Sequence, residues 1–127
     1  MKKSVLVAVL CVVFGGVFAL DIMEELNVAF KKGDYRTFSK YFANNVELNI
    51  PGNEGQFSKA QAEQILRDFF YKNQARDHSI AHQGESKDGA RYTIGNLNTS
   101  NGNFRTYCHI KKQGDALKIY ELRIEKE

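Results

Sequence analysis

The sequence predicts an α+β fold in which three helices pack on one face of an antiparallel sheet. Apolar residues recur at helical spacing in most of the first half of the chain, whereas the second half alternates apolar and polar residues between turn dipeptides. Because the two patterns are segregated, the chain is expected to be α+β rather than a series of βαβ units. The expected order is helix, helix, strand, helix and then four strands (α-α-β-α-β-β-β-β).

Two short helices are expected first. The first covers residues 21–32, where Asp21 and Glu24 have the spacing of a capping box and Gly33 is a typical helix stop. Its apolar face consists of Ile22, Leu26, Ala29 and Phe30. Asp34 is expected to cap the second helix. The apolar stripe of that helix consists of Phe38, Tyr41 and Phe42.

A strand and the longest helix follow. Residues 46–50 alternate strictly, which predicts a half-buried strand, and residues 51–55 have the composition of a turn. Ser58 and Gln61 form a second capping box at the start of the third helix. The apolar residues of this helix recur at helical spacing and are Ala62, Ile65, Leu66, Phe69 and Phe70.

The dipeptides Asp88-Gly89, Asn101-Gly102 and Gln113-Gly114 divide the remaining chain into four strands. The first two dipeptides are strong hairpin signals. The expected strands lie near residues 78–86, 90–99, 104–111 and 116–125.

Two-residue turns at the first two dipeptides would place Gly95 between His82 and Cys108 on neighbouring strands. Alternation then assigns each side chain to one face of the sheet. The more apolar face, expected to pack against the third helix, carries Ile80, His82, Thr93, Leu97, Phe104, Thr106, Cys108 and Ile110. The outer face carries Gln83, Tyr92, Ile94, Asn96, Arg105, Tyr107 and His109.

Two registers are open for the last strand. A two-residue loop at Gln113-Gly114 would turn Ile119, Glu121 and Arg123 inward, and a three-residue loop would turn Tyr120, Leu122 and Ile124 inward. The second is preferred because it buries fewer charges. It has the disadvantage that Arg105 would lie opposite Arg123.

Residues 1–19 have the pattern of a secretory signal peptide. Lys2 and Lys3 precede an apolar run over residues 5–14, and the segment ends in small residues at Ala19. The alternative is a membrane anchor, but this run is shorter than the roughly 20 residues of a spanning helix. We therefore expect cleavage after Ala19, a single domain over residues 20–127 without a membrane span, and a periplasmic or secreted location.

Composition excludes several classes of protein. Of 127 residues, 43% are hydrophobic and 26% are charged, so the chain can form one core and is not a disordered polymer. Loss of Lys2 and Lys3 lowers the net charge from +3 to +1. A charge this small, with no basic cluster, argues against nucleic acid as a partner. Cys108 would be the one remaining cysteine, which rules out an internal disulfide.

Four segments carry a resemblance to known proteins: YFANNVELNIP, SKAQAEQILRDFF, HQGESKDGARYTIGNL and ELRIE. The element order is similar to that of the nuclear transport factor 2-like (cystatin-like) cone, and these segments resemble a bacterial secreted family known as domain of unknown function 4783. The resemblance implies a curved sheet wrapped around a helix and a secreted protein. It implies no catalytic residue, and the cone supports isomerases, hydrolases, cyclases and binding modules alike, so fold does not decide function.

The residues offer little chemistry. His78 and His82 would lie roughly 13 Å apart along a strand, which is too far for one metal ion. His82 and Cys108 would be separated by two strand spacings, roughly 9–10 Å, and Cys108 is expected to be a small buried residue. Glu47 lies between two apolar neighbours and should point outward. No catalytic residue, metal or cofactor is therefore expected.

The expected function is that of a non-catalytic binding or interaction module. A small apolar ligand would lie between the third helix and the sheet, with His82, Thr93, Tyr41 and Phe70 as its contacts. The alternatives are an interior filled by the aromatic residues, a small isomerase or hydratase that uses a pocket acid–base residue, and a subunit of an envelope complex.

A homodimer is expected through the outer face, around Tyr92, Ile94 and Tyr107. On the cone fold that face commonly pairs two subunits. The alternative is a solvated sheet surface that happens to carry aromatic residues.

Overall fold

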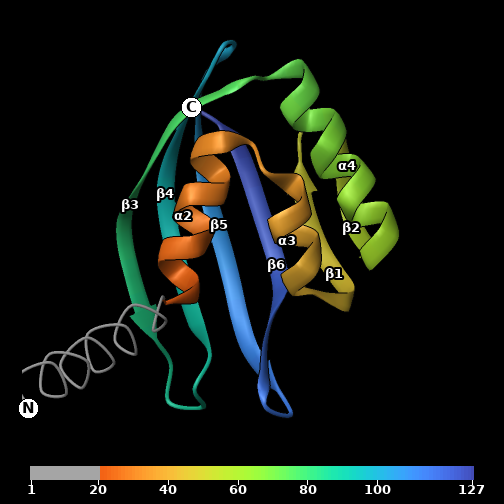
Figure 1. The fold of residues 1–127 in the computed structure, drawn as a ribbon, viewed down its shortest axis with the longest axis vertical. Coiled ribbons are helices and arrows are strands. Elements are labelled where there is room, and N and C mark those ends of the chain that lie inside the picture. Colours follow the sequence, from red (N-terminus) through yellow and green to blue (C-terminus); the bar gives the residue numbers. More distant parts are fainter. Residues whose placement is uncertain (1–20) are drawn as a thin grey trace, which may run out of the picture.

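Three helices cover one face of a six-stranded sheet in the computed structural model, which describes residues 21–127 (Figure 1). The predicted signal peptide lies outside the described residues. The helices are α2 (Ile22–Lys32), α3 (Tyr35–Tyr41) and α4 (Lys59–Lys72). The strands are β1 (Phe42–Ile50), β2 (Asn53–Ser58), β3 (Ala75–Glu85), β4 (Arg91–Thr99), β5 (Gly102–Gln113) and β6 (Ala116–Lys126). None of these helices is long and apolar enough to cross a membrane.

The strands lie in the order β2-β1-β6-β5-β4-β3. The predicted fold class is confirmed, with two differences. The chain between β1 and α4 is a strand rather than a five-residue turn, because Pro51 and Gly52 alone make the reversal, with Gly52 at φ +87°. The sheet is mixed, because β1 and β6 pair in parallel. That pair joins the two halves of the chain, and no local pattern could reveal it.

The three helices begin at the predicted caps and α2 ends at the predicted stop, but Phe42, which was assigned to the second helix, is the first residue of β1. The Asp21 carboxylate accepts a hydrogen bond from the Met23 amide, and Gly33 ends α2 in the left-handed conformation at φ +68°. The Asp34 carboxylate caps α3 through the Thr37 amide. Ser58 begins α4 with a complete capping box. These caps satisfy amide groups that the helices leave free.

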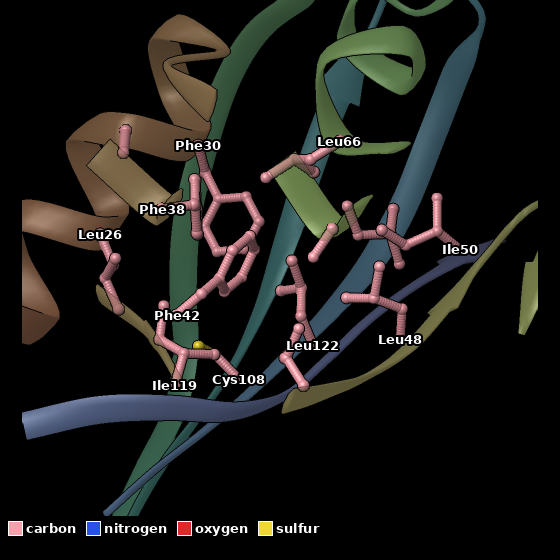
Figure 2. Packing of buried hydrophobic residues seen from close by; sticks show 14 of the residues in the cluster. Leu26, Phe30, Phe38, Phe42, Leu48, Ile50, Leu66, Cys108, Ile119 and Leu122 are labelled. Atoms are coloured by element: carbon pink, nitrogen blue, oxygen red, sulfur yellow. The ribbon is translucent and has the colours of Figure 1, made fainter. Parts of the chain in front are cut away.

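One continuous core lies between the helices and the sheet (Figure 2). Phe30 and Phe38 meet edge to face at 4.6 Å between ring centroids, and Phe69 meets Phe104 in the same way at 5.1 Å. Fully buried aliphatic residues complete it: Leu26, Leu48, Ile50, Leu66, Leu97, Ile110, Ile119, Leu122 and Ile124. Aromatic and aliphatic side chains therefore occupy the space between the layers.

The predicted register between β3 and β4 is wrong. Gly95 lies opposite Ile80, not His82, which lies opposite Ile94. The turn is longer than two residues, since the Ser86 amide donates to the Ala90 carbonyl, and β3 carries one extra residue, Ala81. As a result His82 is exposed on the outer face, whereas Gln83, which was assigned to that face, lies opposite Thr93. The buried histidine is His78.

The register between β4 and β5 differs by two residues. Gly95 lies opposite Thr106, and Thr93 lies opposite Cys108. The turn uses Ser100 and Asn101, one residue before the dipeptide that suggested it. Because the shift is an even number of residues, the predicted faces of both strands are retained.

β6 follows neither of the two registers considered. His109 lies opposite Glu121 but Ile110 lies opposite Ile119, so Tyr120 is an extra residue in β6. This bulge lets Ile119 and Leu122 both point into the core. The buried residues of the strand are Ile119, Leu122 and Ile124, and Tyr120, expected inside, is only half-buried. The expected juxtaposition of two arginines is also wrong, because Arg105 lies opposite Glu125 and Arg123 opposite Tyr107.

Candidate functional site

The helix-covered face of the sheet holds one buried histidine. The Nδ1 atom of His78 lies 2.7 Å from Oδ1 of Asn27, and Nε2 lies 2.8 Å from the Thr106 hydroxyl. The ring stacks on Phe30 with centroids 4.3 Å apart. Burial lowers the pKa of His78 to about 4. His78 is therefore neutral at physiological pH, with Nδ1 donating to Asn27 and the Thr106 hydroxyl donating to Nε2.

The predicted site residues did not include His78, although a glycine inside a strand, Gly95, was a signal for it. A side chain at Gly95 would place its Cβ 2.6 Å from His78 Nε2, so the glycine leaves the space that the imidazole fills. A glycine inside a strand often marks such a close approach. The correct register would have been needed to pair the two residues.

The four predicted ligand contacts do not converge. His82 is exposed on the outer face, and Thr93 is buried on the opposite face of the sheet. Tyr41 donates a hydrogen bond to the Glu25 carboxylate at 2.8 Å, and burial together with that carboxylate raises the Tyr41 pKa to about 12. Phe70 packs edge to face against Phe69. The geometry therefore does not place these side chains around one pocket.

The cysteine and the two glutamates considered as reactive groups are buried, exposed or held in an ion pair. Cys108 is buried, as predicted, and burial raises the pKa of its thiol to about 12. Glu47 is exposed, as predicted. The half-buried Glu121 carboxylate pairs with the Arg123 guanidinium at 2.6 Å. Within residues 21–127, no group of three or more His, Cys, Asp and Glu side chains is placed to hold a metal ion.

The outer face of the sheet gathers the aromatic residues that the sequence assigned to it. Tyr92 and Tyr107 stack with centroids 6.4 Å apart, and Ile94 lies directly opposite Tyr107. The structure adds His82, 6.1 Å from the Tyr92 ring, and Arg123, 5.7 Å above the Tyr107 ring. We call these five residues the outer-face cluster. Its residues come from the four neighbouring strands β3 to β6. The helices lie over the other face of the sheet (Figure 1).

A hollow of about 410 Å³ opens on this face, lined by Ile94, Arg105, Tyr107, Arg123 and Glu125. Partial burial, followed by the nearby Glu121 charge, raises the pKa of Tyr107 above its usual value. The Arg123 pKa is raised by its bond to Glu121. The hollow is therefore lined by one aliphatic residue, one tyrosine and charged side chains of both signs.

Comparison with known proteins supplies the family. The model of DUF4783, a domain of unknown function, matches residues 23–125. The chain belongs to the DUF4783 family. It is 34% identical to a DUF4783 protein from Bacteroides ovatus whose crystal structure superposes with a TM-score of 0.75, covering 80% of this chain and 92% of that one. A DUF4783 protein from Bacteroides uniformis is 32% identical, and its crystal structure superposes with a TM-score of 0.78, covering 84% of this chain and 98% of that one.

More distant structures show the same fold. A nuclear transport factor 2-like protein of unknown function from Cytophaga hutchinsonii is 13% identical, with a TM-score of 0.57 over 84% of this chain and 88% of that one. No curated protein matches the sequence. The likeness confirms the family and the cone-like fold that the resemblance implied.

Proposed function

We propose that this DUF4783 protein is a secreted or periplasmic, non-catalytic interaction module that works as a homodimer through the outer face of its sheet. The observation that carries the proposal is the contrast between the two faces. Helices and core residues cover one face, whereas the outer-face cluster is left uncovered by residues 21–127. The pattern of residues 1–19 supports export.

The composition of the outer face suits a protein interface. Tyrosine and arginine are enriched in the centres of protein interfaces, and both are present in the outer-face cluster. Arg105 and Glu125 lie opposite each other on neighbouring strands, so a two-fold axis between two copies would let these opposite charges meet across the interface. Because one copy carries both charges, this surface can pair with a second copy of itself, which favours a homodimer over an unrelated partner.

The inner face supports a non-catalytic role. Proton transfer at carbon needs an accessible group with a pKa near the working pH. Here both ring nitrogens of His78 are engaged and its pKa is about 4, while the Cys108 thiol stays protonated with a pKa of about 12. The alternative of an isomerase or hydratase gains no support from these groups. Phe69 and Phe70 pack against each other where an apolar ligand was expected.

The dimer is tested by replacing Tyr107 with Asp, which would bury a charge at the proposed interface. We expect sedimentation-velocity ultracentrifugation to find a dimer for the native protein and a monomer for Tyr107→Asp. The matched control is Tyr71→Asp on α4, since Tyr71 is 90% exposed on the helix side and should leave the dimer intact.

Circular dichroism verifies that each variant is folded, and Ile94→Ser replaces Tyr107→Asp if the latter fails to fold. A native protein that stays monomeric at millimolar concentration would refute the dimer. Equal dissociation by the two tyrosine variants would show that the outer face is not its interface.

A further inference from the structure

We propose that the free edge of β3, together with the groove beside it, binds an extended peptide segment in which apolar and basic residues alternate. This site adjoins the proposed dimer surface at His82, but Tyr92, Ile94 and Tyr107 line neither of its hollows. The bound segment would add a strand to the sheet, a mode of recognition in which main-chain hydrogen bonds supply affinity and alternate side chains supply specificity.

The first observation is an edge that lacks the usual protection. The edge strands of the sheet are β2 and β3. β2 is six residues long and carries the exposed carboxylate of Glu54, whereas β3 is eleven residues long and residues 79–84 include no lysine, proline or acidic residue. Charges, proline and short length are the means by which edges avoid pairing. The single protection in residues 79–84 is the bulge at Ala81, so we expect pairing on the regular stretch from His82 to Glu85.

The second observation is a groove along that edge. Two hollows, of about 470 and 340 Å³, share Met23 and Gln83 and lie between the first turn of α2 and β3. The apolar groups Met23 and Ile80 line the first hollow, and Gly84 adds no side chain to the second. An alternate side chain of an added strand would reach Ile80 in the first hollow, because side chains of a strand project to both faces.

The third observation is the charge around the groove. Asp21, Glu24 and Glu85 line it, against one cation, Arg91. Arg91 pairs with Asp21 at 2.9 Å and with Glu85 at 3.8 Å. Glu24 forms no ion pair with any of residues 21–127. The groove therefore keeps a net negative charge and favours a segment that carries lysine or arginine.

The test is an NMR titration of the ¹⁵N-labelled protein with a short capped peptide of alternating valine and lysine. The same peptide with glutamate in place of lysine is the control ligand. We expect the lysine peptide to shift the amide resonances of His82–Glu85 and to slow their hydrogen exchange, while the glutamate peptide leaves them unchanged.

Charge reversal at the groove should weaken this binding. We expect Glu24→Lys to raise the dissociation constant about tenfold, because the variant replaces an attraction with a repulsion. Glu54→Lys makes the same change on the other free edge and should alter the constant by less than about twofold. Both side chains are exposed, so both variants should fold.

Three results would overturn the proposal: no shift at β3, equal binding of the two peptides, or equal weakening by the two variants. A fourth is protection of His82–Glu85 that rises with protein concentration in the absence of peptide. That result would assign the edge to a second copy of the chain. Failure of the β3 test leaves the dimer proposal intact, because Tyr107 lines neither hollow of the groove.

Discussion

Buried residues on the inner face of the sheet depend on their neighbours for the space they fill and for their hydrogen bonds. His78 is 3% exposed, yet each of its ring nitrogens has a hydrogen-bond partner, so its burial leaves no polar atom unsatisfied. Asn27 comes from α2, Thr106 from β5 and the space itself from Gly95 on β4. One imidazole therefore connects a helix to three strands and ties their relative positions together.

Gly95→Ala tests this coupling. The added Cβ would lie 2.6 Å from His78 Nε2 and 2.7 Å from the Ser79 carbonyl oxygen, so the ring or the strand must move. We expect the free energy of unfolding to fall by about 2 kcal/mol, the usual cost of overpacking. Urea denaturation measures it, with Asn96→Ala, exposed at the next position, as the control. A loss no greater than that of the control would contradict the tight fit.

Whole elements are defined by their ends and by alternation. The helices begin at the predicted caps, and α2 ends at the predicted Gly33, because a cap is a contact between residues two to four positions apart. The four strands after α4 lie near their predicted positions. The registers of β3 and β6 differ from the predicted ones, and Ala81 and Tyr120 are extra residues in these strands. A bulge has no sequence signature of its own here, and it moves every later residue to the other face.

Ser58→Ala tests the element that the sequence described best. The variant loses the hydroxyl that accepts from the Gln61 amide at the start of α4. We expect a loss of about 1 kcal/mol in unfolding free energy, or a melting temperature about 5 °C lower. Differential scanning calorimetry measures the shift, and Ser79→Ala, an exposed serine on β3, is the control. Equal melting temperatures for the two variants would show that the cap does not stabilise α4.

The molecule as a whole divides its polar chemistry between two faces. The inner face carries His78, Thr93, Thr106 and Cys108, all buried. The outer face carries rings and charges that other molecules can reach. This division underlies the proposed interaction role, and the buried His78 on the inner face makes stability depend on pH.

Stability should decline on acidification because of His78. Its folded pKa of about 4 is below the ordinary value of 6.5, so the unfolded chain binds a proton that the folded chain excludes. The stabilisation is complete above pH 6.5 and is lost progressively as the pH falls from 6.5 to 4. The full difference is about 3 kcal/mol. The lowered pKa values of Asp21 and Asp88 act in the same direction, but only near and below pH 4.

Urea denaturation at pH 7.5 and pH 5 measures this dependence. Replacing His78 with Gln should remove most of it, whereas His82→Gln, at an exposed histidine, should retain it. If the native protein were equally stable at both pH values, the folded protein would not disfavour protonation of His78. If His82→Gln removed the dependence as well, its assignment to His78 would be wrong.

The sequence correctly predicted which residues of β4 and β5 share the outer face of the sheet. It did not predict which residues lie opposite each other on neighbouring strands. Tyr92, Ile94 and Tyr107 share the outer face as expected, because a shift of two residues preserves alternation. His82 was expected inside and lies outside, because one extra residue in β3 reverses its side. His78 was missed because its partners Asn27 and Thr106 lie on α2 and β5, whose contacts with β3 no local pattern specifies. Arg123 was expected opposite Arg105 and lies opposite Tyr107, because the register of β6 differs from both of those considered.

By itself the sequence determined the α+β class, the three helices with the caps at which they begin, the hairpin order and the family, because each depends on neighbours within a few residues or on shared segments. Only the tertiary structure decided the parallel contact of β1 with β6, the bulges at Ala81 and Tyr120, and therefore which histidine is buried. The physical reason is that packing between distant segments selects a register by the total apolar area it buries. That choice is made by the whole core and not by any single strand.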